Sequence, residues 1–284
     1  MYAITGATGQ LGRLVIDTLL ESVPPAQIVA IVRSAAKAAD LAARGVQIRV
    51  ADYEQPASLV AALAGVDKLL LISSSEIGRR AAQHRAVIDA AKAARVNLLA
   101  YTSVLHADRS TLGLAEEHRQ TEQMLKASGV PTVLLRNGWY TENHAAGIPA
   151  ALAHGALFGA SADGRIASAA RRDYAQAAAA VLLRDGQAGQ VHELAGDDAW
   201  TLAELAAEIS RRSGKTIMPR NLPKADYEAA LLGAGLPAPV AALIADSDAQ
   251  AAGGALFDDG RQLSRLIGRA TTPMSATVAA FLPS

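Results

Sequence analysis

A glycine-rich segment near the start of the chain combines residue types and spacing that suit the binding of a dinucleotide. It reads Thr5-Gly6-Ala7-Thr8-Gly9-Gln10-Leu11-Gly12, after a short β-rich run and before a segment of helical period. Gly6 would permit a tight turn, Gly9 would let the backbone approach a pyrophosphate, and Gly12 would let the helix pack closely on a sheet. The N–H groups at the start of the helix would then bind the phosphates.

The alternative is a strand-to-helix turn that is rich in glycine for structural reasons alone. A lone G-x-x-G-x-x-G match is weak, but this one lies between a strand and a helix at the head of a βαβ series. We therefore predict that a dinucleotide binds at this loop. The predicted contacts are Gly6, Thr8, Gly9, Gln10, Leu11 and Gly12.

The end of the second predicted strand favours NADPH over NADH. NAD-specific sites usually end this strand with a carboxylate that bonds the ribose 2′-hydroxyl. Here the strand ends in Arg33, Lys37 lies one helical turn further on, and the next acidic residue is Asp40. A guanidinium can bond a 2′-phosphate bidentately, whereas the alternative is a solvated surface arginine. Asp52, at the end of the third strand, is either an adenine contact or the cap of the helix that begins near Pro56.

Polar residues follow three further predicted strands, at the carboxyl ends where open α/β sheets bind their ligands. Ser73-Ser74-Ser75 would lie near the pyrophosphate or the nicotinamide ribose, or form an ordinary serine loop. Tyr101-Thr102-Ser103-Val104-Leu105-His106 follows the fifth strand. The run that most resembles a site is Arg136-Asn137-Gly138-Trp139-Tyr140-Thr141-Glu142-Asn143-His144. It offers stacking surface and hydrogen-bond partners for a flat nicotinamide or aromatic substrate, or else forms a helix cap with a buried tryptophan anchor.

The familiar catalytic templates are absent. A Tyr-x-x-x-Lys pair fails because Leu105 lies four residues after Tyr101, and no other tyrosine has lysine at that spacing. The chain has no G-x-S-x-G elbow, and its six histidines show no H-x-x-x-H spacing for a metal. Hydride transfer to a quinone or another conjugated acceptor fits what is left, because the product oxyanion can take its proton from solvent.

The elements that must position these residues alternate between short β-rich runs and longer helical segments. This pattern predicts an α/β fold of the Rossmann type, a doubly wound parallel sheet with helices on both faces. The predicted strands are Tyr2–Thr5, Ile28–Arg33, Gln47–Ala51, Lys68–Ser73, Leu98–Ser103 and Thr132–Arg136. The predicted helices between them are Leu11–Glu21, Ala35–Ala43, Pro56–Ala64, Arg80–Ala94 and Ala115–Ser128.

Beyond about residue 137 the pattern loosens, and we expect a smaller α/β lobe. Residues 1–136 would form the NADP-binding core, and 137–284 mainly a substrate-binding lobe that completes a single-domain fold. The expected elements of this part are a helix at Arg172–Leu183, a strand at His192–Leu194, a helix at Thr201–Arg212 capped by Thr201, two helices within Ala225–Gln250, and a terminal helix at Ser275–Phe281.

The composition excludes several classes of function. The 284 residues contain no cysteine and carry 27 basic and 27 acidic side chains. Thiol catalysis and disulfides are therefore excluded, a reducing compartment fits, and the basic stripe that nucleic acid requires is missing. No signal peptide and no apolar run of membrane-spanning length is present. We expect a cytoplasmic protein with a small-molecule substrate and without metal, nucleic-acid or membrane partners.

The chain resembles the NmrA-like branch of the atypical short-chain dehydrogenases/reductases over essentially its whole length. The segments that carry the resemblance are the glycine loop from Ile4 to Gly12, Ala30-Ile31-Val32-Arg33, Leu70-Leu71-Ile72-Ser73-Ser74-Ser75, and the run from Leu134 to Asn143. The resemblance implies NADPH held by the glycine loop, Arg33, the serine cluster and the stretch Asn137, Gly138, Trp139, Tyr140 and Thr141. It also implies a quinone bound over the nicotinamide.

The sequence departs from the wider family at one position. Isoflavone-type reductases carry a catalytic lysine in the helix before the sixth strand, where this chain has His118. A histidine could donate a proton near neutral pH, or it could be a solvated residue on an exposed helix face. With His118, the catalytic candidates are Tyr140 and Asn143 in the polar run.

Two rival functions fit the same residues. Some NmrA-like proteins look like redox sensors, which bind the oxidised and the reduced dinucleotide alike without turnover. The other rival is a reductase for azo or triphenylmethane dyes, which are flat apolar acceptors like quinones. The oligomeric state leaves no signal in the sequence, and a homodimer is the expectation for the class.

Overall fold

The chain folds into two units, each assembled from segments that are separate in the sequence. The computed structural model describes residues 1–282. The first unit comprises Met1–Ala107, Glu116–Asn137 and Arg171–His192. The second comprises Asp108–Ala115, Gly138–Ala170 and the residues from Glu193 onward. The crossing after Asn137 lies one residue from the division expected after residue 136, but the chain also enters the second unit at Asp108–Ala115 and returns to the first at Arg171–His192.

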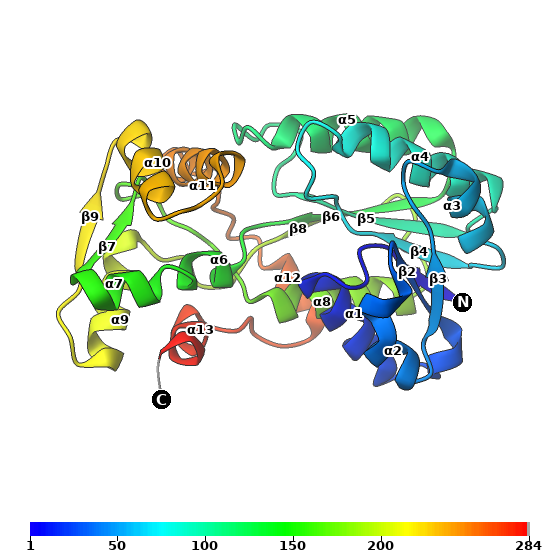
Figure 1. Ribbon diagram of the computed structural model, residues 1–284, viewed down its shortest axis with the longest axis horizontal. Coiled ribbons are helices and arrows are strands. Elements are labelled where there is room, and N and C mark those ends of the chain that lie inside the picture. Colours follow the sequence, from blue (N-terminus) through cyan, green and yellow to red (C-terminus); the bar gives the residue numbers. More distant parts are fainter. Residues whose placement is uncertain (283–284) are drawn as a thin grey trace. The chain divides into compact units, whose positions relative to one another are not determined.

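A seven-stranded sheet in the order β3-β2-β1-β4-β5-β6-β8 carries the first unit (Figure 1). Its first six strands pair in parallel, which confirms the Rossmann-type α/β fold. The strands are β1 (Tyr2–Ile4), β2 (Ile28–Val32), β3 (Gln47–Val50), β4 (Lys68–Leu71), β5 (Leu98–Val104), β6 (Thr132–Asn137) and β8 (Val191–Leu194). The prediction omitted β8 from the sheet, although it expected a short strand there, because four residues carry too little pattern to show which strand they pair with.

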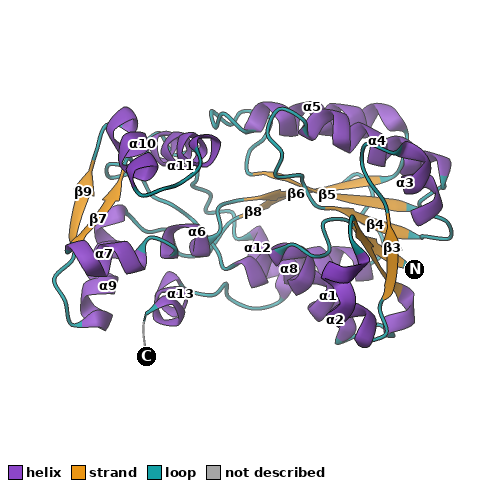
Figure 2. Cartoon of the chain, viewed as in Figure 1, coloured by secondary structure: helices purple, strands orange, loops and turns teal. Residues whose placement is uncertain are grey.

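Helices cover both faces of this sheet, as Figures 1 and 2 show. Helices α3, α4 and α5 lie on one face, and α1, α2 and α8 lie on the other. Burial explains the arrangement, because every residue of β2 and β5 is buried and each strand therefore needs cover on two sides. The helices are α1 (Gln10–Leu20), α2 (Ala39–Ala43), α3 (Pro56–Ala62), α4 (Arg80–Ala93), α5 (Ala115–Ser128) and α8 (Arg171–Leu183).

One predicted helix of this unit is only partly α-helical. The segment expected as a single helix over Ala35–Ala43 begins as a 3-10 turn, Ala35–Ala38, and becomes α-helical only from Ala39. Another 3-10 turn, Pro25–Gln27, precedes β2. Neither helical piece spans more than five residues, a length at which tertiary contacts override intrinsic propensity.

The strand register brings the predicted site loops to one edge of the sheet. Ile4 of β1 is paired with Ala30 on one side and Leu70 on the other, and Leu71 is paired with Tyr101. Because these strands are parallel, their carboxyl ends meet at the same edge. The glycine loop, Arg33 and the serine cluster therefore follow neighbouring strand ends.

The second unit contains a two-stranded parallel sheet and several helices. Strands β7 (Ala156–Gly159) and β9 (Met218–Asn221) pair in register from Ala156 with Met218 to Gly159 with Asn221. Neither strand was predicted, because each has four residues and every residue of β9 is exposed. The helices are α6 (Thr141–Ala145), α7 (Ile148–His154), α9 (Leu202–Ser213), α10 (Lys224–Gly233), α11 (Ala238–Ala251), α12 (Gln262–Ile267) and α13 (Met274–Phe281).

Local sequence signals set several helix boundaries in this unit. Thr201 caps α9 in a capping box with Glu204, which confirms the predicted cap. The two helices expected within Ala225–Gln250 are α10 and α11. Helices α6, α7 and α12 were not predicted, since each has only five to seven residues.

Candidate functional site

The glycine loop is constrained by its own backbone. Gly6 has a positive φ of 59°, which favours glycine, and its carbonyl accepts a 2.9 Å hydrogen bond from the Gly9 N–H. A Cβ on Gly12 would overlap the Gly6 carbonyl oxygen and approach the Ala7 Cα to 2.8 Å. The close contact that requires Gly12 therefore lies within the loop, whereas the sequence led us to expect it against the sheet.

The start of α1 is suited to an anion. Gly9 is the N-cap residue, no side chain of the described part of the chain caps this end of the helix, and no acidic residue lies in its first turn. The partial positive charge of the helix start is thus not neutralised by the protein itself. Gly9 and Gln10 are exposed, Thr8 is half-buried, and the Leu11 side chain is buried, so Leu11 can contribute only its backbone.

Hydrogen bonds tie the loops after β1, β4 and β5 together. The buried Thr5 hydroxyl accepts a bond from the Ile72 N–H at 3.0 Å, and the Thr5 N–H donates to the Leu70 carbonyl at the same distance. The Ser73 N–H donates to the Thr102 hydroxyl at 2.8 Å. The serine cluster is therefore held in place against both neighbouring strands.

Ser74 is held by three side chains from the first two turns of α4, and its N–H, hydroxyl and carbonyl groups are all hydrogen-bonded. Its N–H donates to His84 Nε2 at 2.9 Å, and its hydroxyl donates to Gln83 Oε1 at 2.5 Å. Its carbonyl accepts from Arg80 Nε at 2.7 Å. We call these three side chains, Arg80, Gln83 and His84, the Ser74 clamp. All three are buried, so water does not compete for their hydrogen bonds to Ser74. These contacts could not be predicted from the sequence, because the three side chains lie in a segment with the pattern of an ordinary helix.

The clamp determines the protonation state of His84. Because Nε2 accepts a hydrogen bond, the proton of the neutral ring must be on Nδ1, which lies 3.0 Å from the Thr121 hydroxyl. Thr121 in turn donates to the Glu117 carbonyl at 2.8 Å. Burial, and to a lesser extent the nearby Arg80 charge, lower the pKa of His84 from its usual value to about 3. His84 is therefore neutral at physiological pH.

Arg33 is exposed and forms an ion pair with a residue that sequence analysis missed. Its NH1 lies 3.1 Å from Glu76 Oε1, and 76% of the Arg33 side chain is accessible to solvent. Burial raises the pKa of the Tyr53 phenol, and the charges of Arg33 and Glu76 act on it in opposite directions. The signal for Glu76 was its place just after the serine cluster, at the strand end that should face the ligand.

Asp52 does not cap helix α3. Gln55 is the N-cap residue of that helix, so the cap interpretation of Asp52 is wrong. The Asp52 carboxylate accepts a 3.0 Å bond from the Glu54 N–H two residues on, as in an Asx turn. The adenine contact proposed for Asp52 stays a prediction.

His118 is buried rather than on a solvated face, so that interpretation of it is wrong. It is 4% exposed, and its Nδ1 lies 2.7 Å from the Tyr101 hydroxyl. Burial lowers the pKa of His118 well below its usual value and raises that of Tyr101. Both side chains are therefore neutral near pH 7, which disfavours a charged imidazolium as proton donor.

The polar run that follows β6 is divided between the two units. Asn137 is in the first unit and buried, and its Oδ1 has no hydrogen-bond partner among residues 1–282. A buried amide oxygen without a partner is costly, so this atom suits contact with a ligand. Gly138, Trp139, Tyr140, Thr141 and Asn143 belong to the second unit.

Within the second unit, the run is anchored by backbone and hydroxyl contacts. The Thr141 N–H donates to the Ala169 carbonyl at 3.0 Å, and its buried hydroxyl lies 2.8 Å from that of Ser168. The indole N–H of Trp200 donates to the same Ser168 hydroxyl at 3.0 Å. The buried tryptophan beside this run is thus Trp200, whereas Trp139 and Tyr140 are half-buried and Asn143 is exposed.

The structure therefore groups the predicted cofactor residues of the first unit at one sheet edge. These residues are Gly6, Thr8, Gly9, Gln10, Gly12, Arg33, Ser73, Ser74, Ser75 and Asn137, with Asp52 after the neighbouring β3. The glycine loop that excludes a Cβ and the partnerless oxygen of Asn137 both fit a dinucleotide.

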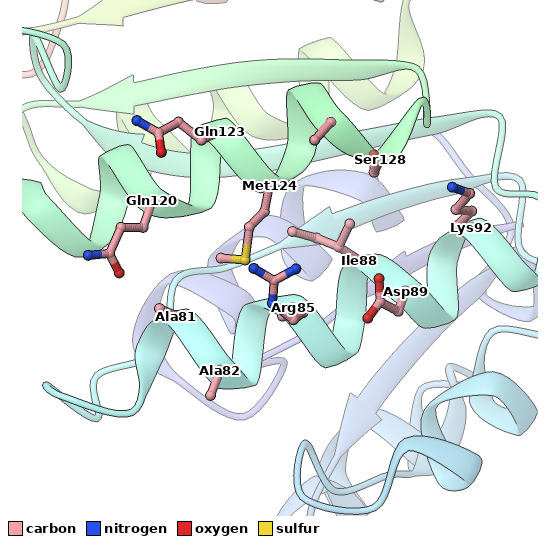
Figure 3. Close-up of a pocket in the computed structure, with 11 residues that line it drawn as sticks. Ala81, Ala82, Arg85, Ile88, Asp89, Lys92, Gln120, Gln123, Met124 and Ser128 are labelled. Atoms are coloured by element: carbon pink, nitrogen blue, oxygen red, sulfur yellow. The ribbon is translucent and has the colours of Figure 1, made fainter.

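A pocket of about 580 Å³ lies elsewhere, between α4 and α5 (Figure 3). It is lined by side chains such as Arg85, Asp89, Gln120 and Met124, and none of the predicted site residues contributes to it. Among residues 1–282, no cluster of three His, Asp or Glu side chains could hold a metal. Within the same range, no helix has the length and apolarity needed to cross a membrane.

The chain is similar to known oxidoreductases over almost its whole length. A family model described as NAD(P)H-binding matches residues 6–185. Quinone oxidoreductase 2 of Escherichia coli is 59% identical over 278 residues, which cover 98% of this chain and 97% of that protein. The crystal structure of an NADPH-dependent quinone oxidoreductase from E. coli, complexed with NADPH, has a TM-score of 0.97 at 58% identity and covers 99% of both chains. Citrobacter triphenylmethane reductase complexed with NADP(H) has a TM-score of 0.95 at 38% identity and covers 99% of this chain and 100% of that one.

Proposed function

We propose that this chain, which belongs to the NmrA-like group of the NAD(P)H-binding family, is a reductase. In this proposal it uses NADPH and transfers hydride to a quinone. The observation that carries the proposal is a group of residues at the sheet edge that suits a dinucleotide. It combines the glycine loop, an uncapped helix start and the exposed guanidinium of Arg33. The E. coli relative at 59% identity supports a quinone as the acceptor.

Each part of the site has a distinct role in this proposal. The backbone of Gly9, Gln10 and Leu11 binds the pyrophosphate, and Arg33 bonds the 2′-phosphate. The clamped serine cluster and the Asn137 amide position the remainder of the cofactor. When bound, NADPH supplies the hydride, and the protein supplies proximity and orientation.

Reduction of a quinone to a hydroquinone consumes one hydride and one proton. His118 and Tyr101 are buried and neutral, so we assign them to the support of the site and not to proton donation. The product oxyanion takes its proton from solvent, a step that requires no side-chain acid. Tyr140 and Asn143 contact the acceptor in this proposal.

The test compares acceptors and cofactors in one assay. The loss of nicotinamide absorbance is followed with a simple benzoquinone, with crystal violet and without acceptor, using NADPH and then NADH. We expect rapid turnover of quinone with NADPH and much slower turnover with NADH. Faster turnover of the dye than of the quinone would favour the dye reductase, which the Citrobacter structure supports as second candidate. Tight NADPH binding without any turnover would favour a sensor.

The absence of cysteine and the use of NADPH support a cytoplasmic location, where that cofactor is kept reduced.

A homodimer is our proposal for the assembly, as the commonest state of such enzymes. Equilibrium sedimentation of the purified chain would give its mass directly, and a monomer would contradict the proposal.

A further inference from the structure

Glu76 occupies the position next to the guanidinium that should bind the 2′-phosphate. It follows the serine cluster, on the segment between β4 and α4, and its Oε1 lies 3.1 Å from NH1 of Arg33. The pair joins the end of β2 to this segment, and both residues belong to the first unit. A carboxylate on this guanidinium is unexpected in a site for a phosphate dianion.

The carboxylate of Glu76 is held from a second direction as well. Its Oε2 accepts a 2.8 Å bond from Gln83 Nε2 and lies 3.6 Å from NH1 of Arg79. The Glu76 N–H donates to the Ser74 hydroxyl at 3.2 Å. Gln83 also accepts the bond from that hydroxyl, so Glu76 is fixed to the Ser74 clamp. Its carboxylate is therefore not free to swing far from Arg33.

The local charges balance before any cofactor binds. Arg33 and Arg79 face Glu76, and Arg79 forms a further ion pair with Glu54. The two arginines and two glutamates of this cluster therefore have a net charge of zero. A bound 2′-phosphate adds negative charge to it. Arg33 uses only NH1 for Glu76, so phosphate bound to its other N–H groups would still lie within a few ångströms of the carboxylate.

We propose that Glu76 is a specificity-determining residue that competes with the 2′-phosphate for Arg33 and so moderates the preference for NADPH over NADH. Without a 2′-phosphate, the Arg33–Glu76 pair can persist, so NADH does not incur this repulsion. With NADPH, the pair is weakened or the two anions repel each other. This inference rests on the proposed 2′-phosphate site at Arg33 and is independent of the acceptor.

The test is the isosteric variant Glu76→Gln, with dissociation constants for NADPH and NADH measured by calorimetry. The amide oxygen can still accept the hydrogen bond from Arg33, and the charge is removed. The amide NH2 would face Gln83 Nε2, so the Gln83 amide must turn to present its oxygen instead. We expect NADPH to bind about two- to fivefold more tightly, the scale of an exposed ion pair, with NADH unchanged. The gain should shrink at high salt because the repulsion is screened.

Two further variants make the outcome specific. Glu54→Gln removes an equal charge that pairs with Arg79 and not with Arg33, and it should alter NADPH affinity less. In an Arg33→Ala background, Glu76→Gln should lose most of its effect, because the competition acts through Arg33. Unchanged NADPH affinity, or equal changes for both cofactors, would overturn the proposal.

A selective weakening of NADPH binding in Glu76→Gln would also overturn it, since Glu76 would then orient Arg33 for the phosphate. Failure of the underlying site is recognised separately. If Arg33→Ala alone leaves NADPH affinity unchanged, the 2′-phosphate assignment is wrong. If Arg33→Ala weakens NADPH binding and Glu76→Gln does nothing, only the role of Glu76 is wrong.

Discussion

At the scale of single residues, the buried side chains of the Ser74 clamp hold the serine cluster in place, a role that their sequence pattern does not indicate. The sequence singled out the serine cluster by its place after a strand. It gave no reason to connect that cluster with His84, because a histidine on a helix is most often structural. The structure shows that the His84 ring receives the Ser74 N–H and is thereby restricted to its neutral form.

The neutral state of His84 predicts how stability depends on pH. The folded pKa of about 3 lies below the ordinary value of 6.5. A lowered pKa stabilises the fold above the unfolded pKa, and this contribution is lost as the pH falls from about 6.5 towards about 3. The free energy of unfolding should therefore decrease with acidification in this window.

The His84→Gln variant measures the share of this one residue. Gln keeps an acceptor for Ser74 but cannot titrate, so its unfolding free energy should fall less steeply with acidification, by up to about 1.4 kcal/mol per pH unit. Urea unfolding followed by circular dichroism, at several pH values between about 4 and 7, gives both slopes. Equal slopes for the two proteins would show that the pKa of His84 is the same in the folded and the unfolded protein.

At the scale of elements, the sequence predicted best where the pattern was long or chemically marked. Helix α5 was predicted with its observed bounds, and the Thr201 cap of α9 was recognised from its own side chain. Strands β7 and β9 could not be predicted, because they are short and their pairing is set by distant contacts. The clamp from α4 was missed for the same reason, since it depends on a turn and a helix meeting in three dimensions.

The geometry of the glycine loop predicts that one substitution weakens the binding of NADPH and NADH alike. In Gly12→Ala the added Cβ would overlap the Gly6 carbonyl, a backbone atom that cannot move without opening the turn. We expect overpacking to cost about 1–3 kcal/mol of stability and to weaken NADPH and NADH binding alike. Gly233→Ala, in helix α10, is the matched control, because a Cβ there would meet no atom of the described residues within 4 Å. Undiminished binding in Gly12→Ala would show that the loop geometry is not needed.

At the scale of the whole molecule, the chain is built from segments that leave a unit and return to it. The sequence indicated the Rossmann-type sheet because alternating strands and helices of crossover length permit few other arrangements. It did not indicate that Arg171–His192 returns to the first unit, since nothing local marks that return. The site residues at the strand ends could be predicted from the fold. The residues that interact with them, Glu76, Tyr53 and Gln83, could be recognised only in the structure.

The measurement that tests the central claim most directly is kcat/KM for NADPH and for NADH with one quinone, in the wild-type protein and in Arg33→Ala. Loss of a charge-assisted contact of about 1.5–3 kcal/mol should lower kcat/KM for NADPH by roughly ten- to a hundredfold and leave NADH nearly unchanged. Equal losses for both cofactors, or no quinone turnover by the wild-type protein, would contradict an NADPH-dependent quinone reductase that recognises its cofactor through Arg33.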